Sequence, residues 1–470
     1  NANGKVNRKA LPDPEIPAVE DRVAPSSEME RQLLKIWVSV LDIKEESIGV
    51  HSDFFELGGH SILAIRLVGQ IREHLGVEVG LPVLFNHPTI ASLSEVITPE
   101  RGTVVIFPEI YFDQVHKYDP FPLTDVQQAY WIGRKDLFDF GNVGTHGYTE
   151  FYASELDIAY FEEVLDVMIR RHDMLRVIFT EDGEQRILEE VPRYKVQVLD
   201  LRTYSASAGD RLFYQWREEL SHQLFTGSEW PLFDIRVTVF PDETYKVHFS
   251  MDALIIDAGS SVILFDEFLR LYLDREFKLS PIELSFRDYV LGEQKLKASE
   301  VYDRSKRYWL DRIESLPLAP ELPMRSLDRL SGTPNFERRR SSLSRDHWQS
   351  LKAHAQQLGI TPTVLLVGCF AEVMKAWSKT SHFSLNLTLF NRIPFHQDVD
   401  KLIGDFTSLT LLEIDSRVSE AFSDRLKSIQ EQLWTDLELK YFSGVEVLRG
   451  YPFRRSIRIR ARPAQFFTHT

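Results

Sequence analysis

The stretch "MDALIIDAGSS", residues 251–261, sets two carboxylates five positions apart in an otherwise apolar run. Around it, "YKVHFSMDALII" (245–256) alternates and then becomes wholly apolar, as a strand does, and "SSVILFDEFLRLYLD" (260–274) has a helical apolar period. A strand that leads into a helix predicts an α/β fold. Because buried charge is costly unless a partner compensates it, Asp252 and Asp257 each need a partner or a chemical role.

Length and composition exclude several classes of protein. The chain has 470 residues, room for roughly three domains of about 150 residues each. Its formal net charge of −15 argues against a nucleic-acid partner. It has no apolar run near the ~20 residues of a membrane span and no apolar core of a signal peptide, so we expect no membrane contact and a cytoplasmic location. The single cysteine, Cys369, has no internal disulfide partner, and its apolar surroundings predict a core position.

The first hundred residues combine a linker with a small helical domain. Residues 1–25 contain "NGKVNRKALPDPEIP" and four prolines, which is linker composition. Ser27 and Glu30 then have capping-box spacing before an apolar helical stripe. A second stripe follows in "DFFELGGHSILAIRLVGQIREHLG" (53–76), where two glycines precede Ser61. Ser61 therefore begins a helix, either as its N-cap or as a modification site at which the helix N-terminus favours a phosphate.

The larger part of the chain reads as one α/β unit. "ELDIAYFEEVLDVMIRRHDMLRVIF" (155–179) predicts a helix running into a strand. "TPTVLLVGCFAEVMKAWS" (361–378) predicts a buried helix, and "FSLNLTLFNR" (383–392) and "DFTSLTLLEID" (405–415) predict strands. No P-loop, dinucleotide fingerprint or metal-ligand cluster is present in the sequence, so we expect no metal.

Two motifs resemble parts of nonribosomal peptide synthetases. "NGKVNR" (3–8) is similar to the end of an adenylation domain, where Lys5 would lie over the acyl-adenylate. "DFFELGGHSILA" (53–64) resembles the prosthetic-group motif of peptidyl carrier domains. This resemblance implies that Ser61 carries 4′-phosphopantetheine, whose thiol holds an acyl or aminoacyl thioester. We assign no chemistry to two neighbours of Ser61, Asp53 and His60. Three apolar residues could contact catalytic domains or belong to the core: Leu63, Phe85 and Ile90.

A second resemblance covers most of the α/β unit. Six segments occur in the order of the motifs of a heterocyclization domain, a relative of condensation domains: "FPLTDVQQAYWIGR" (121–134), "RHDMLR" (171–176), "MDALIIDAGS" (251–260), "LPLAPELP" (316–323), "GITPTVLLVGCFAEVMKAWS" (359–378) and "LIGDFTSLTLLEID" (402–415). The resemblance implies a two-lobed, chloramphenicol-acetyltransferase-like α/β fold with a tunnel between the lobes. It also implies that a carrier-bound Cys, Ser or Thr attacks the upstream thioester and that the new amide is cyclodehydrated to a thiazoline or oxazoline.

This resemblance suggests roles for Asp252, Ala253 and Asp257 in the opening stretch. Ordinary condensation domains have "HHxxxDG", and alignment of its aspartate with Asp257 puts Ala253 at the place of the second histidine. Alanine cannot transfer a proton, which favours heterocyclization over ordinary condensation. The resemblance assigns Asp257 a mainly structural role, and we expect a bidentate salt bridge to Arg392. Asp252 could pair with Arg176 or Arg171, help to order the tunnel, or transfer protons.

Seven further residues belong to the motifs. Thr407 and Ser408 follow Asp405 on an expected tunnel-facing strand and could hydrogen-bond an intermediate. Four residues of the first motif could take part in the chemistry, or could serve only helix packing and capping: Thr124, Gln127, Tyr130 and Arg134.

The expected organisation has five parts. An adenylation-domain remnant and linker (1–25) precede a four-helix carrier bundle (26–98) and a linker (99–118). The heterocyclization domain (119–449) has an N-lobe at about 119–285 and a partial C-lobe at about 300–449, and a basic tail (450–470) with five arginines and no acid follows. The family's "PVVFTS"-like and "QTPQVxLD"-like segments are not found, so a premature end or a shifted reading frame is the favoured interpretation over a natural tail. We expect that these residues alone will not close the ring.

The resemblance implies a set of partners. These are a phosphopantetheinyl transferase, an upstream adenylation domain, and downstream adenylation and carrier domains loaded with Cys, Ser or Thr. Two alternatives stay open: a carrier with an ordinary amide-forming condensation domain, and a non-catalytic carrier and docking module. The sequence does not reveal the donor acyl group or which amino acid is cyclised.

Overall fold

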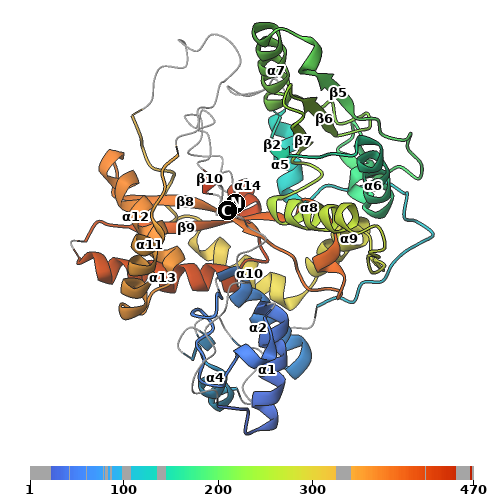
Figure 1. Ribbon diagram of the computed structural model, residues 1–470. Helices are drawn as coiled ribbons and strands as arrows, with labels where there is room; N and C mark the ends of the chain where they lie inside the picture. The colour runs from blue at the N-terminus through green and yellow to red at the C-terminus, as the bar shows by residue number, and fades with distance from the viewer. Residues whose placement is uncertain are drawn as a thin grey trace. The chain divides into compact units, whose positions relative to one another are not determined.

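The computed structural model describes residues 23–41, 43–59, 61–77, 79, 83–84, 87–97, 107–134, 144–323, 340–418, 420–450 and 466–467. The chain forms two compact units, which Figure 1 shows with the element labels used below. Unit 1 consists of Asn1–Ile106, Ser344–Phe370 and Ala421–Glu438. Unit 2 consists of Phe107–Leu343, Ala371–Glu420 and Leu439–Thr470.

Unit 1 contains the carrier helices that the sequence predicts. The predicted cap is confirmed, because Ser27 Oγ accepts the Glu30 N–H (3.1 Å) and Glu30 Oε2 accepts the Ser27 N–H (3.0 Å). Leu33 and Trp37 on the first helix are fully buried, and this helix contacts the second and the last. The described elements of this region are α1 (Glu28–Leu41), η2 (Glu45–Ser47), α2 (Ser61–Leu75) and α4 (Ile90–Val96). Residues 83 and 84 are also helical, and the residues on either side of them lie outside the described part of the chain.

Three later helices contribute to unit 1. They are α11 (Arg345–Gln357), the first part of α12 (Pro362–Trp377) and α13 (Phe422–Glu438). Gln430 on α13 accepts the Thr361 N–H (2.8 Å) and donates to the Gly359 carbonyl (2.8 Å), which ties α13 to the turn before α12. Cys369 on α12 is exposed, so its predicted core position is wrong. It sits on the solvent side of a helix whose other face is buried.

A four-stranded sheet forms the N-lobe of unit 2. Its strands are β2 (His146–Ala153), β5 (Gln197–Asp200), β6 (Phe233–Val239) and β7 (Tyr245–Asp252), in the order β2-β7-β6-β5. All pairs are antiparallel except β5 and β6, which are parallel. The predicted strand at 245–256 is confirmed as far as Asp252 and is wrong beyond it. Residues 253–255 form a turn, because the Asp252 carboxylate and carbonyl accept the N–H groups of Leu254 and Ile255.

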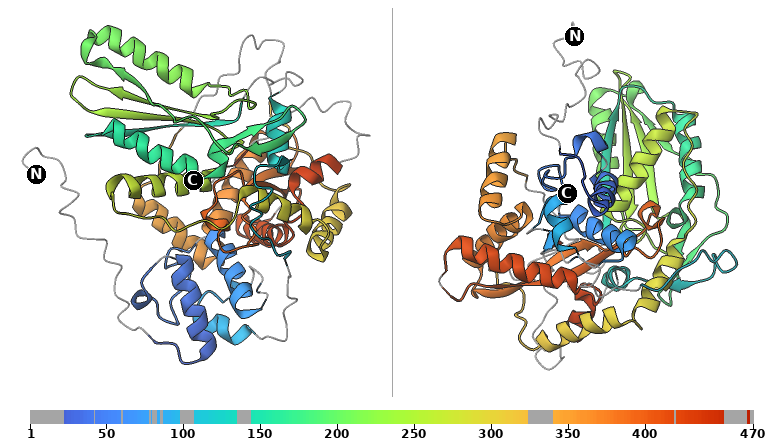
Figure 2. Two further views of the ribbon diagram at one scale, coloured as in Figure 1. Left: turned by 90° about the vertical axis from the view of Figure 1, so that its right-hand side faces the viewer. Right: turned by 90° about the horizontal axis from the view of Figure 1, so that it is seen from below.

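Helices cover both faces of this sheet. The apolar residues of β7 face α6 (Ile158–Arg171) and α8 (Ala258–Leu273), where Phe249 meets Phe161 and Phe265. The polar residues of β7 face α7 (Ala206–Ser221), where His248 meets Phe213. The left panel of Figure 2 shows the sheet between α7 on one side and α6 and α8 on the other. The alternation along β7 thus produces a three-layer lobe.

A smaller sheet and the helix of the first motif lie beside this lobe. The small sheet has the order β1-β4-β3. Its strands and the elements around it are β1 (Phe121–Pro122), α5 (Asp125–Gly133), η3 (Asp173–Arg176), β3 (Val177–Phe179) and β4 (Glu184–Ile187). The short helix η4 (Leu201–Thr203) instead follows β5 and contacts β6 of the larger sheet. The predicted helix that runs into a strand at 155–179 is confirmed by α6, η3 and β3.

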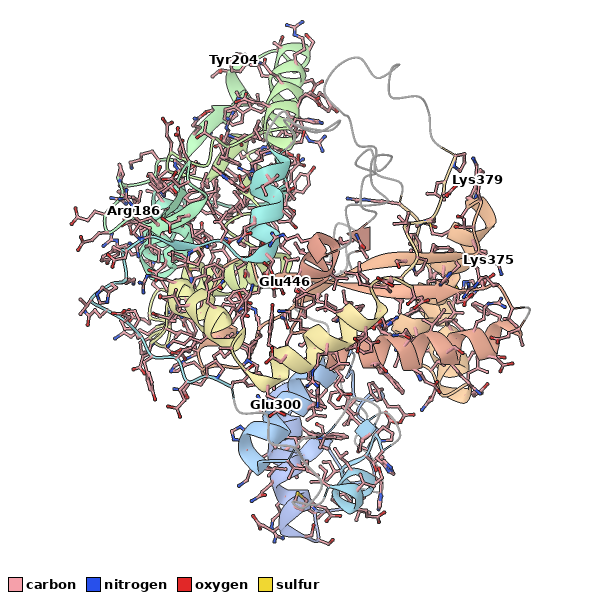
Figure 3. All side chains as sticks on the ribbon, turned by 180° about the vertical axis from the view of Figure 1, so that it is seen from behind. Arg186, Tyr204, Glu300, Lys375, Lys379 and Glu446 are labelled. Atoms are coloured by element: carbon pink, nitrogen blue, oxygen red, sulfur yellow. The ribbon has the colours of Figure 1, made fainter. Side chains whose placement is uncertain are left out.

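The second half of unit 2 is built on a long antiparallel pair, β8 (His382–Phe390) and β9 (Thr407–Asp415), as predicted. A short strand, β10 (Phe466–Phe467), pairs with β8 in parallel. The helices here are α9 (Phe286–Leu296), α10 (Glu300–Arg312), η6 (Val399–Lys401) and α14 (Gly444–Gly450). Figure 3 labels Glu300 and Glu446, which mark α10 and α14. Val126 of α5, Leu409 of β9 and Val445 of α14 form a buried cluster.

Among the described residues, no single helix has the length and apolarity to cross a membrane. The helices α11 and α12 pass such a test only as a pair, and the chain bends by 98° between them.

Candidate functional site

Asp257 caps α8 and ties it to the segment before β9. Its carboxylate accepts the N–H groups of Ser260 (2.6 Å) and Phe406 (3.1 Å), and its own N–H donates to the Gly404 carbonyl (3.1 Å). The residue is only 6% exposed. Backbone N–H groups at a helix N-terminus therefore compensate its charge, and this geometry supports the structural role that the resemblance implies.

The expected bidentate pair between Asp257 and Arg392 is a prediction that the structure corrects. Arg392 donates to the carbonyls of Val399 (2.6 Å) and Leu402 (2.9 Å) and to Ser260 Oγ (2.9 Å). The Ser260 hydroxyl in turn donates to the Gly404 carbonyl (2.7 Å) and accepts the Gly404 N–H (3.1 Å). Arg392 and Asp257 are thus linked only indirectly, through Ser260. The Arg392 guanidinium instead holds the loop between β8 and β9.

Asp252 ends β7 and forms a buried ion pair with Arg134, the residue that follows α5. Asp252 is 1% exposed and also accepts the Leu254 N–H (2.9 Å). Burial raises the pKa of Asp252, and the adjacent Arg134 offsets this only in part. Arg134 also donates to the Phe225 carbonyl (3.2 Å), so the pair pins the end of α5 to the N-lobe.

The expected partners of Asp252 lie elsewhere, which corrects that prediction. Arg176 is buried and pairs with Asp173 (2.7 Å), and it also donates to the carbonyls of Ile169, Leu188 and Glu189. Arg171 forms a two-hydrogen-bond pair with Glu267 of α8, at 2.9 Å for each bond. Both arginines therefore brace the turn between α6 and β3.

Ala253 occupies the turn between the two aspartates. It is partly exposed, and its N–H donates to the Thr145 carbonyl (2.9 Å). Its methyl group has no proton to give or take. The place that a condensation histidine would fill is thus chemically inert in this chain.

Helix α5 is held at its N-terminus by Thr124 and Gln127. Thr124 Oγ1 accepts the Gln127 N–H (3.2 Å), and Gln127 Oε1 accepts the Thr124 N–H (2.9 Å), which is a capping box. The fully buried Gln127 amide also donates to the Leu254 carbonyl (2.7 Å) and exchanges hydrogen bonds with Gln185. Capping and packing therefore account for both residues.

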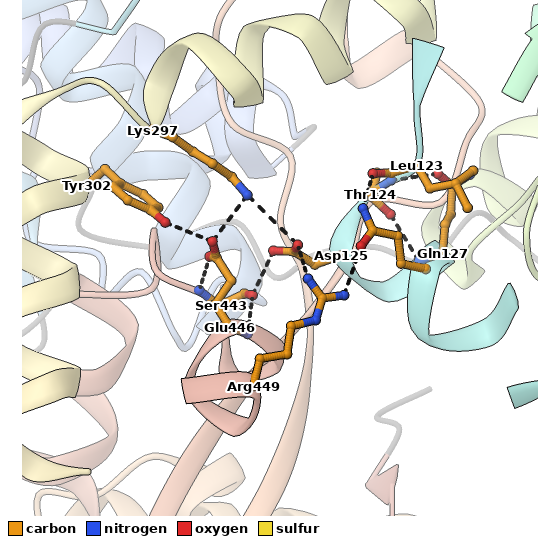
Figure 4. A network of polar contacts seen from close by, with 10 residues as sticks. Leu123, Thr124, Asp125, Gln127, Lys297, Tyr302, Ser443, Glu446 and Arg449 are labelled. Atoms are coloured by element: carbon orange, nitrogen blue, oxygen red, sulfur yellow. Dashed lines mark hydrogen bonds and ion pairs between the residues drawn. The ribbon is translucent and has the colours of Figure 1, made fainter. Parts of the chain in front are cut away.

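A polar network joins the other side of α5 to the second half of unit 2 (Figure 4). Asp125 accepts hydrogen bonds from Ser443 (2.9 Å) and Arg449 (3.3 Å), and Lys297 lies 3.8 Å from it. Lys297 and Tyr302 both donate to Glu446, at 3.1 and 2.7 Å. Through α5, the N-lobe is therefore connected to α9, α10 and α14.

The "GDFTS" segment (404–408) leads into β9, which begins at Thr407. Asp405 is 1% exposed, and its Oδ1 accepts the Thr407 N–H (3.1 Å). Burial, and then Asp257, raises the pKa of Asp405 well above the ordinary range. Tyr130 is partly exposed, and burial, Asp405 and Asp257 together raise the pKa of its phenol. Thr407 is partly exposed on β9, whereas Ser408 is buried.

One partly buried acid carried no signal in the sequence. Glu293 on α9 accepts a hydrogen bond from Tyr289 (3.3 Å), and burial and Asp125 raise the pKa of Glu293 to about 8. Ser260 and Arg134 did carry signals. Ser260 is a polar residue three positions after the helix cap Asp257, and Arg134 is a cation at the end of the first motif.

The carrier motif meets α2 at the predicted place. The helix begins at Ser61 and has no acidic residue in its first turn. Before it, Gly58 has a φ of +103°, and a Cβ on Gly59 would lie 2.4 Å from the Phe54 ring. Only glycine fits both positions. A serine that starts a helix after such a turn fits a phosphodiester-linked group, because helix N-termini favour phosphate.

The motif neighbours of Ser61 are accounted for separately. Asp53 accepts the N–H groups of Phe55 (2.7 Å) and Glu56 (3.2 Å), so it stabilises this turn. Leu63 is partly buried and Ile90 fully buried. His60, Phe85 and Lys5 lie outside the described residues.

Comparisons with known proteins agree with this geometry. A condensation-domain model matches residues 117–446, and a phosphopantetheine attachment-site model matches residues 31–97. Bacitracin synthase 1 of Bacillus licheniformis is 37% identical over 455 residues, which cover 95% of this chain and 9% of the relative. Phenyloxazoline synthase MbtB of Mycobacterium tuberculosis (strain ATCC 25618 / H37Rv) is 33% identical, with coverage of 88% and 30%. The chain spans from 9% to 37% of the length of such curated relatives.

A solved structure extends this likeness to the fold. The cyclization-docking bidomain of the nonribosomal peptide synthetase EpoB from Sorangium cellulosum, in its monoclinic crystal form, superposes with a TM-score of 0.68 and is 31% identical. The match covers 86% of this chain and 76% of the bidomain. The chain therefore belongs to the condensation-domain family, as a heterocyclization-type fragment of a nonribosomal peptide synthetase that also carries a phosphopantetheine attachment site.

Proposed function

We propose that the chain holds an acyl group as a thioester on a phosphopantetheine arm at Ser61 and condenses it with carrier-bound Cys, Ser or Thr, as the entry to thiazoline or oxazoline formation. The observation that carries this proposal is Ala253. It takes the place of the condensation histidine while both flanking aspartates are buried and engaged, Asp252 by Arg134 and Asp257 by backbone N–H groups. Relatives whose names include oxazoline synthesis and cyclization support it.

The proposed chemistry has two stages. The amine of the acceptor attacks the thioester carbonyl, the C–S bond breaks, and the arm leaves as a thiol after taking a proton. The side-chain thiol or hydroxyl of the acceptor then attacks the new amide carbon. The carbonyl oxygen departs as water with the side-chain proton and the amide proton, which leaves a C=N bond in the ring. In the first stage, charge develops on the carbonyl oxygen, and hydrogen-bond donors aimed at that oxygen accelerate such reactions.

The proposal also assigns roles to the domains of the chain and to partner proteins. With the domain bounds expected from the sequence, residues 26–98 act as the carrier and residues 119–449 as the catalytic domain. A phosphopantetheinyl transferase would load Ser61, an upstream adenylation domain would supply the acyl group, and downstream adenylation and carrier domains would present the acceptor. Thr407, partly exposed beside Asp405 and Tyr130, is the proposed contact for an intermediate. We place this activity in the cytoplasm.

The test uses the full chain with its arm loaded by an acyl group. Downstream carriers loaded with Cys, Ser, Thr or Ala are added, and mass spectrometry follows the acceptor. Amide formation with Cys, Ser or Thr in preference to Ala is the expected result. A product lighter by one water would show that these residues also close the ring, against our expectation from the sequence. Equal transfer to Ala, without loss of water, would instead favour ordinary condensation, and no transfer at all would contradict the proposal.

A further inference from the structure

A groove of about 720 Å³ runs beside helix α6 in the N-lobe. One wall is the face of α6 that carries Tyr160, Val164 and Val167, at the i, i+4, i+7 spacing of a single helix face. The opposite wall is the end of α8 and the segment that follows it, as far as Ile282. From Tyr160 to Arg171 the α6 wall is about 16 Å long, at about 1.5 Å per residue. The groove is therefore elongated and of the size that small ligands occupy.

Hydrogen bonds join the two walls near both ends of the groove. Tyr160 Oη donates to the Leu271 carbonyl (2.8 Å), and Arg171 Nη1 donates to the Ser280 carbonyl (2.7 Å). Arg171 is itself held by two hydrogen bonds to Glu267, at 2.9 Å each. The folded chain thus sets the shape of the groove in advance, which lowers the entropy cost of binding.

The walls of the groove are apolar and open to the surface. Val167 is 48% exposed, and Leu279 and Ile282 on the opposite wall are only partly buried against the core. The aromatic rings of Tyr160 and Phe277 also belong to the lining. An apolar chain that entered the groove would remove these side chains from water, which is favourable.

The charged side chains of the groove are mainly cations, although the chain as a whole has a formal net charge of −15. Among the lining residues that the structure describes, Glu163 is the single acid, whereas Arg171, Arg275 and Lys278 are cations. The charge of Arg171 is compensated by its pair with Glu267. Arg275 and Lys278 therefore remain to attract an anion.

Both of these cations can reach a ligand. Arg275 lies over the Tyr160 ring, 3.9 Å from its centroid. Its ion pair with Asp157 is 3.6 Å long and joins side chains that are 68% and 56% exposed, so the pair is weak. Lys278 is exposed, and within the described part of the chain it forms no hydrogen bond or ion pair. Since Glu163 lies on the α6 wall, an anionic group is best placed on the opposite wall.

We propose that this groove binds a medium-chain carboxylic acid, with its apolar chain between α6 and residues 277–282 and its carboxylate at Lys278 and Arg275. The apolar walls account for the chain, and the two cations account for the carboxylate. The binding is non-covalent. It goes beyond the proposed acyl transfer and does not depend on it.

The two parts of the ligand can be tested separately. The full chain is titrated with octanoate and with 1-octanol by isothermal titration calorimetry, each below the concentration at which it aggregates. Octanoate should bind to wild type, and more tightly than octanol. Lys278→Glu should weaken octanoate binding by about fivefold or more, because a repulsion replaces an attraction. The same substitution should leave octanol binding unchanged.

The location of the site is tested by a matched pair of variants, Val167→Glu and Val262→Glu. Both valines are exposed on helices, 48% and 69%, but of the two only Val167 lines the groove. Val167→Glu should weaken octanoate binding at least about tenfold, because a charge then interrupts the apolar wall. Val262→Glu should bind octanoate like wild type. Circular dichroism verifies that each variant is folded.

Three results of these titrations would overturn the proposal. They are the absence of octanoate binding to wild type, equal affinities in the two valine variants, and octanol bound as tightly as octanoate. Sedimentation velocity tests a different occupant. A wild-type dimer that Val167→Glu dissociates would mean that a second copy of the chain fills the groove in place of a small acid, and this too would contradict the proposal.

Discussion

A single hydroxyl, that of Ser260, holds three parts of unit 2 together. It bonds to the backbone of Gly404 in both directions and receives a hydrogen bond from Arg392, while Asp257 accepts the Ser260 N–H. The helix α8, the loop before β9 and the end of β8 thus meet at one buried residue. Removal of the hydroxyl leaves buried polar groups without a partner, which is where hydrogen bonds matter most for stability.

We expect Ser260→Ala to lower the free energy of unfolding by about 1–3 kcal/mol, because it orphans the Gly404 backbone and part of Arg392. The adjacent Ser261→Ala is the control. Among the described residues its hydroxyl bonds only to the Asp257 carbonyl within the helix (2.9 Å), so its loss should be smaller than about 0.5 kcal/mol. Urea unfolding of both variants provides the measurement, and similar values would show that the Ser260 contacts do not bear on stability.

A second prediction concerns the buried ion pair between Arg134 and Asp252. Arg134→Met leaves a buried carboxylate without its cation and should cost about 3–5 kcal/mol. Asp252→Asn in the same chain removes the orphaned charge, so the double variant should recover most of that loss. A double-mutant cycle by denaturant unfolding measures the coupling. Additive effects of the two substitutions would rule out a direct pair.

The sequence predicted the nature of these residues better than their partners. The prediction that Asp257 is mainly structural and that Ala253 cannot transfer a proton came from the motif, because it depends on residue types. The partner of Asp252 could not, since Arg134 lies 118 positions away and the nearer arginines were equally plausible in one dimension. The predicted pairing of Asp257 with Arg392 was wrong because Asp257 binds backbone N–H groups, including that of Ser260, whereas Arg392 binds the Ser260 hydroxyl and two carbonyls, which no spacing reveals.

At the scale of elements, β7 shows how a local hydrogen bond overrides a hydrophobic pattern. The apolar run continues to residue 256, but the strand ends at Asp252 because its carboxylate accepts the Leu254 N–H and turns the chain. The same turn exposes the Leu254 carbonyl to Gln127 of α5. Helix α5 is therefore anchored at its N-terminus through Gln127, at its C-terminus through Arg134, and on its side through Val126.

This anchoring of α5 can be tested with two neighbouring glutamines. Gln127 is fully buried and satisfies the Leu254 carbonyl, Gln185 and the helix cap. Gln127→Ala should therefore destabilise unit 2 by at least about 1–3 kcal/mol. Gln128→Ala should cost less, because in the part of the chain that the structure describes the Gln128 side chain bonds only to the Leu123 carbonyl and to the exposed Arg449. If thermal unfolding shows equal losses, α5 is not held in place by Gln127.

At the scale of the whole molecule, most of the elements could be predicted because their apolar periods are long and regular. The exception was the side of α12 that carries Cys369, since a helix with apolar residues all round does not show which face is covered. The expectation of a two-lobed architecture came from the order of the motifs. The surroundings of Glu293 could not be predicted, because they include groups from distant parts of the chain, such as Asp125.

Glu293 makes the stability of the molecule depend on pH. Its pKa rises from an ordinary value of 4.5 to about 8 in the folded chain, because of burial and then Asp125. Between these two pH values the unfolded chain has released a proton that the folded chain retains, so stability falls as the pH rises from 4.5 to 8. Glu293→Gln should flatten this slope in melting experiments from pH 5 to 8, whereas the exposed Glu314→Gln should leave it unchanged. An unaltered slope in Glu293→Gln would show that Glu293 is not the group responsible.

The central claim is that an acyl group held on Ser61 passes to the amine of a Cys, Ser or Thr acceptor. Its most direct test is intact-protein mass spectrometry of the chain and of Ser61→Ala, each treated with a phosphopantetheinyl transferase and an acyl donor and then mixed with a Cys-loaded carrier. We predict that only the chain with Ser61 gains the arm and the acyl group, and that the acyl group then appears on the acceptor as an amide. Acyl transfer from Ser61→Ala, or no transfer from a fully loaded chain, would contradict the account.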